Sequence, residues 1–285
     1  MTDFGLLFAP VISLPDRPPL VVKMHGSVGQ ISEREPEKPA SALDSALARV
    51  TEAALLPMAD GLCAYSPINA AEWSARFDVP VDMIPPPMTL PPLQPKTLSD
   101  YSGLVAGRIQ AWKGPHRLCE AVAAAGSHLP KDFVMAWAGR DTDTAPDGTS
   151  FSAWLDRHYP TIWGTRVVPK GQLAADTLAS LQSSVRYVVV PSLWDTFNYV
   201  LAESMAAGAV TVGSQGAGAA FLLQDGVNGF TFDISNTQEF AAKLLTAHSL
   251  DAKARAEIGE AARATIDRQL NPGAIASATQ CRSPS

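Results

Sequence analysis

Short apolar runs that alternate with helical stretches constrain the fold of this 285-residue chain more than any other feature. Beyond residue 100 the predicted strands are continuous apolar runs, as expected for parallel strands that helices cover on both faces. Strands that alternate with helices form right-handed βαβ units. The sequence therefore predicts an α/β fold with a doubly wound parallel sheet. The predicted strands are Gly103–Ala106, Phe133–Ala138, Arg166–Val168, Tyr187–Pro191, Val210–Gly213 and Phe230–Phe232, and the predicted helices are Gly114–Ala125, Gln172–Ser183, Tyr199–Ala207 and Gly218–Gln224.

A shorter α/β section precedes this one and is separated from it by prolines. Six prolines fall between Pro85 and Pro95, and such a stretch cannot continue a helix or a central strand. We therefore predict two domains, residues 1–97 with the linker and residues 98–285. In the N-terminal domain, strands are predicted at Leu20–Met24, Gly61–Ala64 and Val79–Ile84, and helices at Ser41–Met58 and Asn69–Arg76. Two closing helices are predicted at Ser235–Ala247 and Asp251–Arg268, and from Asn271 onward we expect a loose tail.

Composition excludes several classes of protein. The net charge of −6 argues against the basic field that nucleic-acid binding usually needs. No apolar run approaches the roughly 18 residues of a membrane span, and Met1–Ala9 lacks the features of a secretory signal, so we expect a cytoplasmic protein. Cys63, Cys119 and Cys281 have neither metal-ligand nor disulfide spacing and are interpreted as incidental thiols. The histidines are equally scattered, and no metal site is predicted.

The first candidate site residues follow the strand Gly103–Ala106. In sheets of this kind ligands bind beyond the carboxyl ends of the strands. Arg108 and Lys113 stand there between glycines, close to the start of a helix, and could hold an anion beside its free N–H groups. An exposed arginine and lysine in an ordinary turn is an equally good interpretation of this segment alone.

The second cluster follows the strand Tyr187–Pro191. Asp195 is predicted in the loop before a helix, with Thr196 as its N-cap. Glu203 falls about two turns later and is expected to face a crevice among apolar residues, where a carboxylate needs hydroxyl donors or a partner. The alternative is a surface glutamate on an amphipathic helix. A glycine-rich stretch at 213–218 is a weak phosphate signal, and a flexible turn explains it better.

Together these segments resemble glycosyltransferase family 4, the retaining group 1 enzymes of GT-B type. The matching segments are GLVAGRIQAWKG and, later in the chain, VVVPSLWDTFNYVLAESMAAGAVTVGSQGAGAAFLLQDGVNGFTF. The resemblance extends from about Tyr101 to Asp267. The family usually shows two glutamates with seven residues between them. Here Asp195 stands for the first and Glu203 for the second.

The resemblance implies a GT-B architecture of two Rossmann-like domains and assigns roles to single residues. Family members normally have glycine near position 198, so Asn198 is a departure that narrows the approach to the ligand. By resemblance, Arg108 and Lys113 hold the diphosphate of a nucleotide sugar, Glu203 binds the ribose, Asp195 contacts the transferred sugar, the amides of Thr196, Phe197 and Asn198 lie close to the sugar and phosphates, and the stretch around Gly171 lies beside the base.

The front section resembles the other domain of the family more loosely. VVKMHGS is similar to the strand and histidine near the donor sugar, which makes His25 a candidate site residue, although a lone histidine at a strand end is as often structural. The stretch ending at Ser66 is similar to the next strand. Only about 20 residues precede the histidine strand, so we expect an incomplete acceptor-side domain. The chain is then a gene fragment, has a mis-assigned start, or needs a partner chain or a peripheral membrane contact.

The activity implied is glycosyl transfer from a nucleoside-diphosphate sugar to a glycan, lipid or small-molecule hydroxyl, with retention and without metal or other cofactor. One alternative is a non-catalytic module that still binds the nucleotide sugar. Another is a dinucleotide-dependent oxidoreductase, which would need G-x-G-x-x-G after the first strand. That pattern is absent, because Arg108 follows Gly107.

Overall fold

The computed structural model describes residues 14, 16–34, 42–93 and 99–280. The chain forms two compact units that divide between Pro86 and Pro87, inside the proline-rich stretch. This division lies N-terminal to the predicted boundary after residue 97.

The second unit is built on a six-stranded parallel sheet in the order β6-β5-β4-β7-β8-β9. The chain runs outward from β4 to β6 and then returns to the other side of β4 with β7. This order confirms the predicted doubly wound α/β fold. The strands are β4 (Gly103–Ala106), β5 (Met135–Ala138), β6 (Val167–Gly171), β7 (Tyr187–Val190), β8 (Thr211–Ser214) and β9 (Phe230–Phe232).

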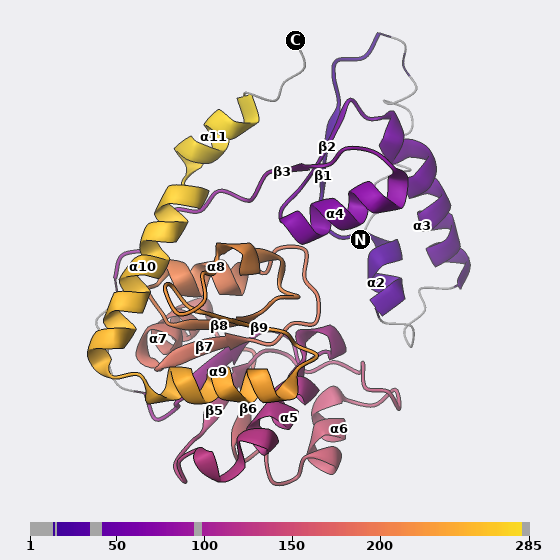
Figure 1. Cartoon of the computed structure of the whole chain (residues 1–285). Coiled ribbons are helices and arrows are strands. Elements are labelled where there is room, and N and C mark those ends of the chain that lie inside the picture. The colour runs from indigo at the N-terminus through magenta and orange to yellow at the C-terminus, as the bar shows by residue number, and fades with distance from the viewer. Residues whose placement is uncertain (1–13, 15, 35–41, 94–98, 281–285) are drawn as a thin grey trace. The chain divides into compact units, whose positions relative to one another are not determined.

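Helices cover both faces of this sheet, and alternate residues of each strand face alternate layers. Val105 and Val189 pack in the cluster that includes α5 (Pro115–Ala125) and α9 (Thr237–Ser249). Leu104 and Val188 pack toward α7 (Ala175–Ser184) and α8 (Tyr199–Ala206). Figure 1 shows α8 and α9 on opposite sides of the sheet. Burial on both faces explains why the strands are apolar throughout.

Two helices follow one another at the C-terminal side of the unit. The second of them corrects the expectation of a loose tail from Asn271 onward. α10 (Ala252–Leu270) packs along α8, and its Gly259 lies so close that a Cβ there would stand 2.2 Å from the carbonyl oxygen of Gly208. The expected loose tail is instead the helix α11 (Pro272–Gln280). Asn271 Oδ1 accepts the N–H of Ala274 at 2.9 Å and proline occupies the first turn, which are both helix-start signals.

Other elements also differ from the sequence prediction. The helix α6 (Phe151–His158) was not predicted; Ser150 caps it and Phe151 and Leu155 anchor it in the core. The predicted helix at Gly218–Gln224 is only a short 3₁₀ helix, η4 (Gly218–Leu222). Another 3₁₀ turn, η3 (Gly126–His128), follows α5.

The first unit holds a three-stranded parallel sheet in the order β1-β2-β3. Its core is centred on the fully buried Trp73, which stacks on Phe77. The third strand is only two residues long, shorter than the predicted Val79–Ile84. The elements are β1 (Val21–Met24), α2 (Val28–Arg34), α3 (Ala42–Leu55), η1 (Leu56–Met58), β2 (Gly61–Ala64), α4 (Pro67–Phe77) and β3 (Asp82–Met83).

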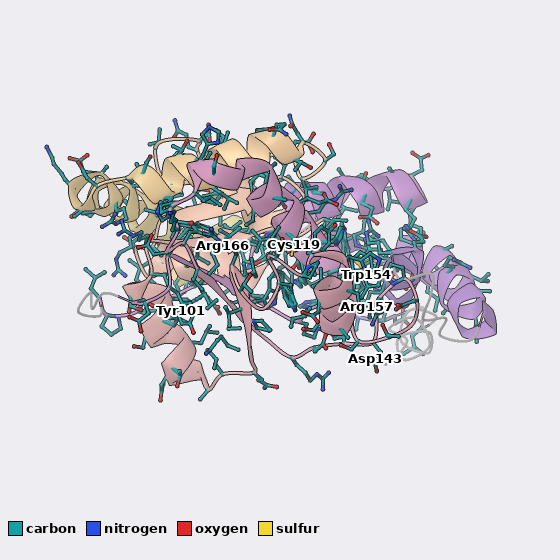
Figure 2. The ribbon with its side chains drawn as sticks, turned by 90° about the horizontal axis from the view of Figure 1, so that it is seen from below. Tyr101, Cys119, Asp143, Trp154, Arg157 and Arg166 are labelled. Carbon is teal, nitrogen blue, oxygen red and sulfur yellow. The ribbon has the colours of Figure 1, made fainter. Side chains whose placement is uncertain are left out.

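The two cysteines within the described residues are buried and unpaired. Cys63 lies on β2, and Cys119 is enclosed on α5 (Figure 2). Burial raises the pKa of the Cys119 thiol to about 12, which makes it a poor nucleophile. Cys281 lies outside the described residues. Within the described part of the chain, no helix combines the length and apolarity that crossing a membrane requires.

We expect Gly259→Ala to lower the free energy of unfolding. Alanine at a helix-interior glycine normally stabilises by about 1 kcal/mol, but here the added methyl group meets the Gly208 carbonyl and the overpacking cost of about 1–3 kcal/mol wins. Denaturant titration followed by circular dichroism measures the change. Ala264→Gly, at an exposed position of the same helix, calibrates the helix-propensity effect. A more stable Gly259→Ala variant would contradict the close packing of α10 on α8.

Candidate functional site

The order of the strands selects one place on the second unit for a ligand. After β4 the chain passes through α5 to β5, which lies on one side of β4 in the sheet. β7 lies on the other side of β4. This is the topological switch point of the sheet, and ligands of open parallel sheets bind there, beyond the carboxyl ends of the strands. The loops after β4 and β7, residues 107–114 and 191–198, therefore define the candidate site.

These two loops are in direct contact. The N–H of Leu193 donates to the carbonyl oxygen of Trp112 at 2.7 Å. Gly114 has φ 71°, and a Cβ at this position would stand 1.9 Å from the carbonyl oxygen of Pro191. Only glycine permits both this conformation and this approach. The glycine after Lys113 is thus required for docking the loops.

Lys113 and Asp195 form an ion pair across the loops. Lys113 ends the short 3₁₀ helix η2 (Ala111–Lys113), and its Nζ donates to Oδ2 of Asp195. The two side chains are 22% and 18% exposed, so the pair is partly shielded from water. The sequence placed these residues on different parts of a ligand, and the pairing between them was not predicted. It leaves the lysine within reach of solvent.

Asn198 fixes the start of α8. It adopts φ 71°, a region that asparagine tolerates better than most residues, and its Oδ1 accepts the N–H of Leu201 at 3.1 Å. Its Nδ2 donates to Ser192 Oγ and to Asp195 Oδ2, both at 3.1 Å. The N-cap is therefore Asn198, whereas the sequence analysis predicted Thr196. A glycine-like conformation explains why glycine is expected here, and the buried amide bonds to its own loop.

The glycine-rich stretch after β8 has a structural role. The N–H of Asp195 donates to the carbonyl of Gly216 at 3.1 Å. A Cβ at Gly216 would stand 2.2 Å from the carbonyl of Leu193, and one at Gly218 would stand 2.4 Å from that of Thr196. These glycines let the loop after β8 pack against the loop that carries Asp195.

Tryptophans flank both members of the ion pair. Trp112 and Trp194 precede Lys113 and Asp195, are partly exposed, and pack edge to face with ring centroids 6.3 Å apart. The guanidinium of Arg108, an exposed residue, lies 6.0 Å from the centroid of the Trp112 ring, within range of a cation–π contact. The sequence analysis did not predict this aromatic pair. Its only signal in the sequence was a tryptophan immediately before Lys113 and another immediately before Asp195.

Glu203 is exposed on α8, and this corrects the expectation that it faces a crevice among apolar residues. The helix buries Leu201, Ala202 and Met205 instead. Partial burial raises the pKa of Glu203 above its usual value. Within the described residues no cation forms an ion pair with its carboxylate, which remains open to hydroxyl donors.

The remaining predicted residues of the second unit lie at the same edge of the sheet. Gly171 ends β6 with φ 67°, its carbonyl accepts the N–H of Gly139 at 2.8 Å, and a Cβ at this position would meet no atom within 4 Å. Thr196 is half-buried, and Phe197 is buried with its ring edge-on to Tyr199 at 5.3 Å. The side chain of Phe197 therefore supports the loop from beneath.

His25 belongs to the first unit and follows β1. Its Nε2 lies 2.8 Å from the hydroxyl of Tyr65. The ammonium of Lys23 lies 4.3 Å from the centroid of the Tyr65 ring. Burial, followed by the charge of Lys23, lowers the pKa of His25. The lowered pKa favours the neutral imidazole. Because a phenol is the better donor, Tyr65 is expected to donate to Nε2 and leave the proton on Nδ1.

The polar groups behind His25 hold its backbone. Nδ2 of the buried Asn69 donates to the carbonyls of Met24 and His25, each at 3.3 Å, and Oδ1 of Asn69 accepts from the buried Gln30. Ser66, at the end of the next strand, caps α4. The end of β1 is thereby a fixed point of the first unit.

Among the described residues, no group of three or more histidine, cysteine, aspartate or glutamate side chains is arranged to hold a metal ion. At the carboxyl edge, the described site offers a ligand the charges of Arg108, Lys113 and Asp195.

A family model described as "Glycosyl transferases group 1" matches residues 101–249, which contain the ion pair and both docked loops. The D-inositol 3-phosphate glycosyltransferase of Arthrobacter sp. (strain FB24) is 28% identical over 86% of this chain. The match covers 60% of that relative, so the chain spans less than two thirds of its length.

Solved glycosyltransferase structures share the fold. Sucrose-phosphate synthase from Thermosynechococcus elongatus superimposes with a TM-score of 0.73 at 21% identity, covering 97% of this chain and 70% of the other. The Anabaena protein HepE, solved in complex with UDP-glucose, gives a TM-score of 0.70 at 20% identity, covering 98% and 77%.

Replacing Lys23 with glutamine is expected to raise the pKa of His25, because the lysine charge disfavours the imidazolium. The measurement is an NMR titration of the His25 ring protons. Lys131→Gln, which removes an exposed lysine from the second unit, should leave the midpoint unchanged. Equal midpoints in the wild type and Lys23→Gln would remove the electrostatic link between these residues.

Proposed function

Because this chain belongs to the glycosyl transferases group 1 family, we propose that it transfers a sugar from a nucleoside-diphosphate sugar to an acceptor hydroxyl, as a retaining enzyme of glycosyltransferase family 4. The observation that carries the proposal is the Lys113–Asp195 pair at the switch point of the sheet, inside the matched residues. The neighbour HepE was solved with UDP-glucose, which makes UDP the first nucleotide to test.

In this proposal, Lys113 binds the diphosphate without losing Asp195. An ammonium group has three N–H donors, so one can stay on the carboxylate while another reaches a phosphate oxygen. Arg108, at the same edge, adds a second positive charge. The departing diphosphate gains negative charge in the transition state, and fixed cations stabilise that charge. No metal is assigned to this role.

The two carboxylates recognise hydroxyl groups. Asp195 keeps one oxygen that the Lys113 and Asn198 bonds do not use, and this oxygen is proposed to accept from the transferred sugar. Glu203 is proposed to accept from the ribose, since it is exposed and lacks an ion-pair partner among the described residues. His25 is proposed to offer Nδ1–H to the donor sugar.

Retention is proposed to follow from attack on the face that the leaving group occupies. The acceptor oxygen bonds to the anomeric carbon as the bond to the diphosphate breaks, and a phosphate oxygen takes the acceptor proton. No carboxylate nucleophile is then needed, in contrast to retaining glycosidases. The acceptor is a glycan, lipid or small-molecule hydroxyl, and the relative's named substrate, D-inositol 3-phosphate, is the first acceptor to test.

A nucleotide-binding module without transfer remains the second candidate, because Asp195 and Asn198 depart from the glutamate and glycine of the family pattern. Saturable nucleotide binding together with absence of sugar transfer to any acceptor, and of donor hydrolysis, would favour it.

We expect Arg108→Ala and Lys113→Ala each to weaken UDP, GDP or ADP binding, whichever binds the wild type best. Each loses a charge-assisted contact worth about 1.5–3 kcal/mol, or about tenfold or more in Kd. Calorimetry measures the change. Carrying it out in the presence of EDTA also tests the expectation that binding needs no metal ion. Lys253→Ala, at an 85% exposed side chain, is the matched control.

The double variant Lys113→Ala, Asp195→Asn separates two roles of the lysine. If Lys113 contacts phosphate, removing the repulsion of an unpaired Asp195 leaves most of the loss in place. Full recovery of affinity in the double variant would reduce Lys113 to a counter-ion of Asp195. Unchanged affinity in both single variants would contradict the proposal that Arg108 and Lys113 bind the diphosphate.

Glu203→Gln is expected to weaken the matching nucleoside and its diphosphate by a similar factor of about ten, since hydrogen bonds to a charged acceptor are worth about 1.5–3 kcal/mol. Binding of pyrophosphate alone should not change. The three ligands are compared by calorimetry, with Glu257→Gln on the exposed face of α10 as control. A loss seen with pyrophosphate but not with the nucleoside would contradict the ribose role.

A further inference from the structure

A cavity lies at the end of the same sheet opposite to the candidate site. It has a volume of about 200 Å³ and sits where β7 and β8 begin, next to the end of α8 and the start of α10. A four-residue strand is about 13 Å long, so this cavity is separate from the carboxyl edge where the donor is proposed to bind. It is lined by Gln182, Ser183, Ser184, Val185, Arg186, Ala207, Gly208, Ala209, Val210, Ala252 and Arg255.

Two arginines from different elements line this cavity. Arg186 immediately precedes β7 and is exposed, and Arg255 lies in the first turns of α10 and is partly buried. Arg255 Nη1 donates to the carbonyl of Leu250. Within the described residues neither guanidinium forms an ion pair with a carboxylate. The cavity therefore carries positive charge in a protein whose net charge is −6.

The two guanidinium groups act on each other. Burial, and next the charge of Arg186, lower the pKa of Arg255, while the carboxylate of Asp251 acts in the opposite direction. Asp251 uses Oδ1 to cap the N–H of Ala254 at 2.8 Å, so it serves the helix start. Both arginines also lower the pKa of His248, after burial, against the opposing charge of Asp132. Like charges held together in this way favour a bound anion.

The rest of the lining suits a small ligand with an anionic head. Val185, Ala207, Ala209 and Val210 supply an apolar surface, and the cavity lies at the first turn of α10, where helix N–H groups favour negative charge. The volume is below the roughly 300 Å³ at which pockets for drug-sized ligands begin. A nucleotide sugar therefore exceeds it, whereas a phosphate group on a compact body fits.

We propose that this cavity is a phosphate-binding site, in which Arg186 and Arg255 hold the phosphate group of a small molecule. A phosphate that carries about two negative charges balances both guanidinium groups and can accept two donors from each. The ligand is inorganic phosphate or a small phosphoester. The site is independent of the proposed donor site and stands whether or not the chain transfers sugar.

The test uses the full chain with Arg108→Ala and Lys113→Ala as background, so that the carboxyl edge does not contribute phosphate binding. Inorganic phosphate and glycerol 3-phosphate are titrated by calorimetry at constant ionic strength. We expect saturable binding at one site, and the tighter of the two ligands tells free phosphate from a phosphoester. Adding Arg186→Gln and Arg255→Gln should weaken binding at least tenfold, whereas adding Lys253→Gln on α10 should not.

Arg186→Gln alone keeps the proposal testable if the change at Arg255 unfolds the protein, because Arg186 is exposed and its side chain makes no hydrogen bond to described residues. Circular dichroism melts establish that each variant is folded. Absence of saturable binding in the background chain overturns the proposal, and so does undiminished binding in Arg186→Gln.

Discussion

The close approach of the loops after β4 and β7 is the constraint on which the rest of the candidate site depends. The Pro191 carbonyl occupies the space that any side chain at position 114 would need. That approach brings Trp112 O to the N–H of Leu193 and Lys113 to Asp195. It is possible only because β4 and β7 are neighbours in the sheet although 80 residues separate them in the chain, a pairing that the doubly wound order creates. The chemistry of the edge is thus a consequence of strand order.

The same sheet explains why its two ends differ. At the carboxyl end, the loops carry a paired lysine and aspartate, two tryptophans and an exposed arginine. At the amino end, the strands start beside Arg186 and Arg255, which have no carboxylate partner within the described residues. Both faces between these ends are filled by apolar side chains from α5 and α9 or from α7 and α8. The polar groups of the candidate donor site and of the proposed phosphate site therefore lie at opposite ends of this sheet.

The sheet was predictable from the sequence because its signal is local. Runs such as Tyr187–Pro191 are apolar on both faces and end at turn residues, and every strand of the second unit begins within two residues of its predicted start. Features that depend on contacts between distant segments were not predictable. α11 is a helix although we expected a loose tail: Asn271 and Pro272 are local start signals, and the buried Ile275 adds packing that the sequence does not reveal. The cap of α8 was assigned to Thr196, although the glycine normally found near position 198 pointed to a positive φ, the conformation in which Asn198 Oδ1 accepts the N–H of Leu201.

The ion pair shows why residue types alone gave only part of the site. Arg108, Lys113 and Asp195 were each predicted to meet a ligand, yet the structure first brings two of them to one another. A lysine held by a carboxylate is positioned before any ligand arrives, so less side-chain entropy is lost on binding. The same carboxylate repels a diphosphate, so anion binding at this edge requires more cation than Asp195 neutralises. Arg108, which rests against Trp112 and pairs with no carboxylate among the described residues, supplies that excess positive charge.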